Sequence, residues 1–173
     1  SFSKEDAKRT QIYQSNIKRK NLLKKSLNLN AYLKSLKMKS EMSNFKKIYL
    51  QRISQLFLRS NQFNLTTTRY QKKNLLDLIK KKSSYTLQAT LTDKFGENGI
   101  VSLVIGSYED DKLIIENWVM SCRVLSRNLE YAIIKKIILD LKNRKNIKKI
   151  IGIFKPSGRN NLVKNHYKKL GFK

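Results

Sequence analysis

Hydrophobic residues recur at helical spacing through the first half of the chain. Apolar positions three to four residues apart predict helices over 4–38 and 49–58, and residues 71–82 are typical of a short basic helix. No glycine or proline occurs in the first 95 residues, which favours helices there. Between these helices, residues 39–44 are the best candidate for a linker, and residues 61–68 predict a polar loop or the entry to a strand.

The period of the pattern changes to two at Tyr85, where apolar and polar residues begin to alternate. Two apolar runs of strand length follow, separated by turn-forming residues. The dipeptide Asn98-Gly99 is a strong signal for a hairpin turn. The pattern predicts a three-stranded antiparallel meander with strands at 85–91, 100–105 and 113–120 and turns at 95–99 and 107–112.

Residues 129–141 have a strongly amphipathic pattern and predict a long helix. Residues 147–154 predict a strand, which Pro156 brings to an end. A last helix is predicted over 161–170, because glycine, here Gly171, commonly follows a helix C-terminus. Helices, a meander, a helix, a strand and a helix in this order predict an α+β fold and not a doubly wound one.

Positive charge dominates both ends of the chain. The 173 residues have a formal net charge of +26, distributed as +8 over 1–45, +9 over 46–84, −2 over 85–128 and +11 over 129–173. Such charge favours an acidic protein, a nucleic acid or an anionic membrane as partner, and biased residue usage rich in Lys, Asn and Ile explains it equally well. We expect no nucleic-acid partner, because Lys outnumbers Arg and the basic segments lack interleaved aromatic residues.

The rarest residue types exclude several kinds of site. A single Cys excludes a disulfide framework and a multi-Cys zinc site, and a single His excludes a His-rich metal site, so we expect no metal. No apolar run approaches the roughly 18 residues that a membrane span needs. The chain begins at Ser1 without an initiator Met or an apolar signal core, so we expect a cut-down piece of a cytoplasmic protein.

The last 45 residues resemble the GNAT acyltransferases. A meander, a loop opening a long helix, a strand, and then Asn160 and Tyr167 before a final Leu-Gly-Phe follow the order of that fold. The resemblance implies a mixed sheet flanked by helices, here with an N-terminal helical arm. It also implies that Asn160 bonds the amides of a pantetheine chain.

GNAT proteins hold the pyrophosphate of acyl-CoA on a loop of the form R/Q-x-x-G-x-G/A, through backbone N–H groups at a helix N-terminus. The helix pattern places this loop at 125–130, with Asn128 and Glu130 at the glycine positions. An alternative register begins at Arg123, with Ser126 and Asn128 at the glycine positions. Neither register contains a glycine. The residues implied to bind the cofactor phosphates are Leu125, Ser126, Arg127 and Asn128.

A closer resemblance covers nearly the whole chain. The C-terminal half of FkbH-like proteins (HAD superfamily subfamily IIIC) is similar to the strings RISQLFLRSNQFNLTTTRY, DKFGENGIVSLVI, WVMSCRVLSRNLE and PSGRNNLV…HYKKLGF. In that family a HAD-type phosphatase-like domain precedes a GNAT-like domain. The resemblance implies a helical connector or arm over 1–45 and a GNAT-like domain over 46–173 that lacks the last strands of the fold.

The FkbH-like resemblance implies that this domain transfers a glyceryl or hydroxyacyl group to the phosphopantetheine thiol of an acyl carrier protein. The implied partners are that carrier and the HAD-like phosphatase domain of the same protein, with no membrane. We expect no tightly bound cofactor beyond the carrier's phosphopantetheine, or acyl-CoA in its place. Two alternatives stay open: a non-catalytic module that docks the carrier protein, and an ordinary acetyl-CoA-dependent N-acetyltransferase.

Two residues are candidates for catalysis. Tyr167 matches the GNAT general acid that protonates the leaving thiolate, or it is an aromatic packed on an amphipathic helix. Cys122 could carry an acyl group beside Arg123, or it is a small hydrophobic residue at a strand end. We expect His166 to be exposed. The carboxylates Asp93 and Glu97 fit the meander turn better than a general base.

Polar loops supply the remaining candidates. By the family match Ser157 and Arg159 contact phosphate, whereas a solvated loop or a helix cap also explains Ser157, Arg159 and Asn160. The loop at 61–68 is rich in amide and hydroxyl groups. It either lines a site, or its side chains hydrogen-bond the loop's own backbone. The residues expected to contact substrate are Asn61, Gln62, Asn64, Thr66 and Arg123. A cluster of Tyr167, Asn160 and Cys122 around an open tunnel favours an enzyme, and a filled tunnel favours docking.

Overall fold

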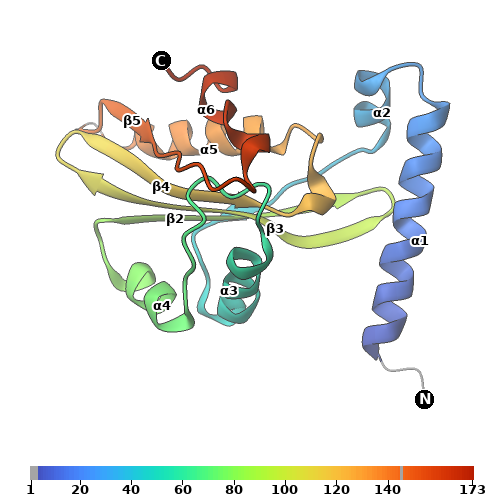
Figure 1. Ribbon diagram of the computed structural model, residues 1–173, viewed down its shortest axis with the longest axis horizontal. Helices are drawn as coiled ribbons and strands as arrows, with labels where there is room; N and C mark the ends of the chain where they lie inside the picture. Colours follow the sequence, from blue (N-terminus) through green and yellow to red (C-terminus); the bar gives the residue numbers. More distant parts are fainter. Residues whose placement is uncertain (1–3, 145) are drawn as a thin grey trace. The chain divides into compact units, whose positions relative to one another are not determined.

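The structure is a computed structural model that describes residues 4–144 and 146–173 (Figure 1). The chain forms two compact units. The first combines the residues up to Ser40 with Leu91–Gly99, and the second combines Glu41–Thr90 with Ile100–Lys173. No helix of the described residues is both long and apolar enough to span a membrane.

The first unit contains the predicted N-terminal helical arm. The helical segment expected over 4–38 is present as two helices, α1 (Lys4–Lys25) and α2 (Leu29–Ser35). Asn28 separates them by capping α2, since its Oδ1 accepts a hydrogen bond from the Ala31 N–H at 2.9 Å. Asparagine favours such caps over helix interiors, and it therefore divides a segment whose apolar spacing is helical throughout.

The sheet is mixed and has five strands in the order β1-β2-β3-β4-β5. β1 pairs with β2 and β3 with β4 in antiparallel register, whereas β5 runs parallel to β4. The predicted linker at 39–44 contains the boundary between the two units, after Ser40, and also the edge strand β1. The bounds are Met42–Ser43 for β1, Ser84–Asp93 for β2, Gly96–Glu109 for β3, Lys112–Met120 for β4 and Lys149–Gly152 for β5.

The three-stranded meander is confirmed, but its first turn differs from the prediction. The turn between β2 and β3 consists of Lys94 and Phe95, and Asn98-Gly99 lies inside β3. The Asp93 carboxylate accepts a hydrogen bond from the Phe95 N–H at 2.9 Å, and Gly96 supplies a φ of +132° directly after the turn. These two features close the chain four residues earlier than the Asn-Gly signal indicates.

Helices cover both faces of the sheet in the second unit. Figure 1 shows α3 (Leu50–Arg59) and α4 (Lys72–Lys80) on one face, and α5 (Leu129–Lys142) and α6 (His166–Lys169) on the other. The predicted helices at 49–58, 71–82 and 129–141 are thereby confirmed. The core between α3, α4 and the sheet is formed by Phe45, Leu50, Ile53, Leu56, Phe57, Leu75, Ile100, Leu103, Ile105 and Val119.

The end of the chain is less regular than its pattern. The single helix expected over 161–170 is divided into a 3₁₀ turn, η3 (Asn161–Val163), and α6. Asn165 interrupts it with a φ of −105° and a ψ of 17°. Of the strand expected over 147–154, only β5 pairs with β4, because the chain then turns to a different partner. That change of partner shapes the candidate site.

Candidate functional site

β4 and the chain that follows β5 separate beyond the pair Ile115–Gly152. The gap between them is occupied by the polar loop at 61–68. In this loop the Leu65 N–H donates to the Trp118 carbonyl at 3.1 Å, and the Met120 N–H donates to the Phe63 carbonyl at 3.0 Å. On its other side the loop accepts a hydrogen bond from the Lys155 N–H at 2.9 Å, through the Leu65 carbonyl. The loop thus acts as a short strand between the two separating segments.

Asn160 links the loop at 61–68 to the chain that follows β5. Its side chain is fully buried. The Nδ2 group donates to the carbonyls of Asn64 at 2.8 Å and Lys155 at 2.9 Å, and Oδ1 accepts from the Ser157 N–H at 2.9 Å. The amide hydrogen-bonding groups that would bind a pantetheine chain are therefore committed to the protein's own backbone.

The loop residues divide into two groups. Asn64 is buried and bonds within the loop, donating to the Ser60 carbonyl at 3.1 Å and accepting from the Thr67 N–H at 2.8 Å. Thr66 is also buried, and its N–H donates to Asn117 Oδ1 at 3.2 Å. Asn64 and Thr66 therefore hold the loop in place. Asn61 and Gln62 instead line a surface groove.

This groove, which we call the arginine groove, has a volume of about 630 Å³. It lies at the carboxyl end of β4, where the strand passes into the 3₁₀ turn η2 (Cys122–Val124). Cys122 is an exposed free thiol on its wall. None of the described residues that line it is acidic. These residues are Arg52, Leu56, Arg59, Ser60, Asn61, Gln62, Phe63, Met120, Ser121, Cys122 and Arg123.

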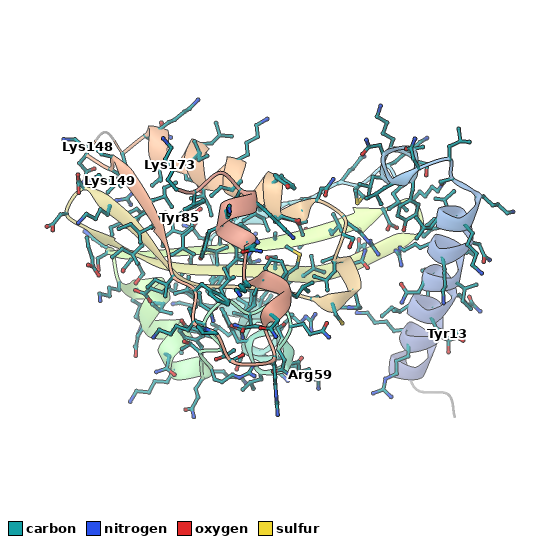
Figure 2. The ribbon with its side chains drawn as sticks, turned by 45° about the horizontal axis from the view of Figure 1, so that its top comes forward. Tyr13, Arg59, Tyr85, Lys148, Lys149 and Lys173 are labelled. Carbon is teal, nitrogen blue, oxygen red and sulfur yellow. The ribbon has the colours of Figure 1, made fainter. Side chains whose placement is uncertain are left out.

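Three guanidinium groups give the groove its charge. Arg52 and Arg59 come from α3, and Arg59, labelled in Figure 2, projects outward from the end of that helix. Arg123 comes from η2. Burial lowers the pKa of Arg52, and the like charges of Arg123 and Arg59 lower it further. Arg52 therefore lies within electrostatic range of both other arginines of the groove.

The loop between β4 and α5 has two residues in the left-handed region: Ser126 has a φ of 61°, and Asn128, the N-cap of α5, has a φ of 60°. Glycine is the residue that this region favours. The glycine positions of the expected phosphate motif therefore coincide with Ser126 and Asn128, which supports the register that begins at Arg123. Glu130 then lies outside the motif, in the first turn of α5.

Arg127 does not lie at a rim where it could meet a phosphate. It is buried, and its Nη2 donates to the Arg123 carbonyl at 3.0 Å. Arg127 therefore braces the loop from inside. Ser126 and Asn128 are exposed, and Leu125 and Ser126 line a small cavity of about 140 Å³ beside η3 and α6.

No family model and no curated protein matches the chain. Several solved structures are similar to it. The ribosomal-protein-S18-alanine N-acetyltransferase from Escherichia coli has a TM-score of 0.56 at 15% identity, with 78% of each chain covered. A transcriptional regulator from Bacillus halodurans C-125 has a TM-score of 0.60 at 13% identity, with 78% of this chain and 93% of that chain covered. AAC(6')-Iy in complex with the bisubstrate analog CoA-S-monomethyl-acetylneamine has a TM-score of 0.55 at 13% identity, with 78% and 91% covered.

The chain has the GNAT fold. The predicted α+β class and the mixed sheet flanked by helices are confirmed with it. At these identities the likeness establishes the fold alone.

Tyr167 lies on a different cavity from Cys122. Its ring packs against Gly152 so closely that a Cβ added there would stand 2.3 Å from the ring. Its hydroxyl is buried without a hydrogen-bond partner, and burial raises its pKa. The cavity beside it, of about 480 Å³, is lined by β5 and the C-terminal residues. Tyr167 and Cys122 thus line two different cavities, and Asn160 lines neither of them.

His166 is buried, contrary to the expectation of surface exposure. Its ring is edge-on to the rings of Phe63 and Trp118, with centroids 5.0 and 4.5 Å away. Its Nε2 is buried without a hydrogen-bond partner. Burial, followed by the charge of Lys169, lowers its pKa to about 4. At neutral pH His166 is an uncharged part of an aromatic cluster.

The other predicted residues lie on the surface or in the first unit. Ser157 and Arg159 are exposed, and Ser157 Oγ accepts from the Arg159 N–H at 3.4 Å, so they form part of an exposed turn. Asp93 is engaged by Arg19 in the first unit, whereas Glu97 is exposed. No group of three His, Cys, Asp or Glu side chains in the described part of the chain could hold a metal ion.

Sequence reasoning missed Arg52 and Arg59. Their spacing contains a usable signal, because residues seven apart on a helix share one face. Two arginines on one face of α3, next to a loop rich in amides, indicate a polar surface rather than a core. What the spacing cannot show is that Arg123, 64 positions further along than Arg59, lies at the same groove.

Proposed function

We propose that this GNAT domain transfers a glyceryl or other hydroxyacyl group to the phosphopantetheine thiol of an acyl carrier protein. The observation that carries the proposal is the backbone of the loop at 123–128. Left-handed residues at Ser126 and Asn128 lead directly into α5, a helix of 14 residues. The first N–H groups of such a helix have no partner within it and attract phosphate.

The side chains of that loop favour a carrier over free CoA. Ser126 and Asn128 keep a Cβ and an exposed polar side chain where a glycine would let the backbone approach closely. The pyrophosphate of CoA needs close approach to several amides, whereas the phosphopantetheine of a carrier has a single phosphodiester. We therefore expect weaker binding of free CoA than of carrier-linked pantetheine.

The charge of the chain supports the same partner. Carrier proteins are acidic, and the formal charge of this chain is +26, with the excess outside residues 85–128. Complementary charges speed association and weaken with salt. The carrier should therefore bind more weakly as ionic strength rises from about 0.05 to 0.3 M. An affinity that does not change with ionic strength would contradict this part of the proposal.

Cys122 is the group we assign to carry the acyl chain between thiols. Its thiolate attacks the carbonyl carbon of the incoming thioester, a carbon–sulfur bond to Cys122 forms, and the donor thiol leaves with the proton that Cys122 lost. The carrier's thiolate then attacks the Cys122 thioester, and Cys122 regains a proton as the acyl group leaves. The exposure of the Cys122 thiol makes both attacks accessible.

A second candidate is a non-catalytic docking module for the carrier. It is favoured by the loop at 61–68, which occupies the gap between β4 and the chain after β5. An ordinary acetyl-CoA-dependent N-acetyltransferase fits the solved neighbours equally well. Calorimetry with acetyl-CoA separates this last candidate, because only it requires tight, stoichiometric CoA binding.

Intact-protein mass spectrometry tests the proposal directly. A glyceryl-pantetheine thioester is mixed with a holo carrier protein and catalytic amounts of the chain, and the glyceryl-carrier is quantified. We expect faster formation than without the chain, loss with Cys122→Ser, and no change with the exposed control Gln14→Ala on α1. Carrier binding without any acceleration would establish the docking alternative instead.

A further inference from the structure

We propose that Arg52, Arg59 and Arg123 form a binding site for an oxyanion carried by the acyl group, so that the domain binds hydroxyacyl chains whose far end bears a carboxylate or phosphate more tightly than the uncharged glyceryl group. The assignment of the oxyanion to the acyl group rests on the proposed function. The existence of the oxyanion site does not, because it follows from the groove itself.

The arginines are set up as anion ligands. Arg52 Nη2 donates to the Ile100 carbonyl at 3.1 Å, and Arg123 Nε donates to Ser121 Oγ at 3.4 Å. Each of these bonds fixes a guanidinium plane and uses one of its five N–H donors. The planar fork that remains matches the oxygens of a carboxylate or a phosphate.

The charges of the groove are uncompensated by the side chains that line it. None of its described lining residues is acidic, and Arg52 is repelled by both Arg59 and Arg123. Like charges that face one cavity destabilise each other until an anion lies between them. Arg52 is half-buried, so water screens this repulsion less than it would on an open surface.

The polar neighbours add donors. Asn61 Oδ1 accepts a hydrogen bond from Arg69 Nη2 at 2.6 Å. This bond turns the Asn61 side chain into a donor for the groove, through its amide N–H groups. The apolar part of the wall consists of Leu56, Phe63 and Met120. A volume of about 630 Å³ accommodates an oxyanion and a short carbon chain together.

The position of Cys122 makes this a specificity site. Cys122 and Arg123 are adjacent in η2, and both line the groove. An acyl chain whose distal oxyanion is held by the arginines therefore has its thioester within the same groove as the Cys122 thiol. A neutral acyl chain of equal length has no such anchor, and its affinity should be lower by about tenfold, the loss of one charge-assisted pair.

The first experiment tests the oxyanion site without any carrier or transfer. The chain is titrated with inorganic phosphate, and separately with acetate, at constant ionic strength, and amide NMR shifts are followed. We expect saturable shifts around the arginine groove. Arg52→Gln and the exposed Arg59→Gln should each weaken phosphate binding about tenfold, and the exposed control Arg9→Gln, on α1, should change it less than twofold. Absence of saturation, or equal loss with Arg9→Gln, overturns the site.

The second experiment asks whether the oxyanion belongs to the acyl group. Succinyl-pantetheine and butyryl-pantetheine have acyl chains of the same length and lack the phosphate of the carrier's arm. We expect succinyl-pantetheine to bind about tenfold more tightly, and Arg123→Gln to abolish the difference. Equal binding, together with intact phosphate binding, would assign the site to the phosphodiester and overturn the acyl assignment. Failure of transfer alone would leave this result intact and would count against the proposed function.

Discussion

Arg19 of α1 and Asp93 at the end of β2 form a buried, two-pronged ion pair. Arg19 Nε lies 2.7 Å from Asp93 Oδ2, and Arg19 Nη2 lies 2.8 Å from Asp93 Oδ1. The two side chains are 6% and 0% exposed. Asn16 Oδ1 accepts the Arg19 Nη1 donor at 3.0 Å. The pair joins residues 74 positions apart and holds the helical arm to the hairpin within the first unit.

Removing one partner of this pair should loosen the arm. Arg19→Met leaves the Asp93 carboxylate buried without its cation, which costs about 3–5 kcal/mol. We expect faster amide hydrogen exchange in α1 and a lower urea midpoint. The exposed control Arg9→Met should change neither. The double variant Arg19→Met/Asp93→Leu should recover part of the loss, and a double variant as unstable as Arg19→Met alone would show that the charge is not the cause.

His166 should make the domain sensitive to mild acid. Its folded pKa is about 4, below the value of 6.5 for an exposed histidine. Between these values the unfolded chain binds a proton that the folded chain does not, so stability falls as pH decreases from about 6.5 toward 4. The loss can reach about 3 kcal/mol. Urea unfolding at pH 7.5 and pH 4.5 measures it.

The matched variant for this test is His166→Phe. It keeps an aromatic ring against Phe63 and Trp118 and removes the titrating group and its unpaired Nε2. The pH dependence of stability in this range should shrink by the part that His166 supplies. Wild-type and variant curves that stay parallel from pH 7.5 to 4.5 would mean that other groups cause the acid sensitivity.

Tyr167→Phe should leave acyl transfer unchanged and preserve or raise stability. The Tyr167 hydroxyl is buried without a partner, a state that costs about 1–3 kcal/mol, and it lines a different cavity from Cys122. Initial rates of carrier loading should agree within twofold, with thermal unfolding as the control for folding. A hundredfold slower transfer in a stably folded variant would instead establish Tyr167 as the general acid.

The fold could be predicted from the sequence because its elements follow local periodicity. The helices α3, α4 and α5 and the strands of the meander lie where apolar spacing places them. The first turn could not be predicted in this way, since distant groups determine it: Ser15 Oγ donates to the Phe95 carbonyl at 2.8 Å, and the Lys94 N–H donates to the Leu36 carbonyl at 3.0 Å. Contacts with a helical arm override the intrinsic preference of Asn98-Gly99.

The site was only partly predictable for a related reason. A polar loop at 61–68 fits both the wall of a site and a loop whose side chains hydrogen-bond its own backbone, and its residues serve both purposes. Gln62 lies on the arginine groove, whereas Asn64 lies inside the loop. Which residue does which depends on the pairing of Leu65 with Trp118 and Lys155, and this long-range pairing leaves no trace in local spacing.

The loop at 123–128 gives the sharpest test of how this domain treats CoA. Ser126 and Asn128 adopt φ values of 61° and 60°, a region that costs a residue with a Cβ about 1 kcal/mol and costs Asn less. Ser126→Gly should therefore stabilise the domain by about 1 kcal/mol, and Asn128→Gly by less. Denaturant unfolding measures both.

The same substitutions should open the loop to pyrophosphate. Without the two side chains, the backbone N–H groups before α5 can approach both phosphates of CoA, and we expect Ser126→Gly/Asn128→Gly to bind acetyl-CoA at least tenfold more tightly by calorimetry. Glu130→Gln serves as the control, because it removes a charge without the helix cost of glycine. If the motif begins at Arg123, Glu130→Gln changes CoA affinity little. A gain from Glu130→Gln that equals the gain from the double glycine variant would restore the register at 125–130, in which the carboxylate and not the backbone conformation repels CoA.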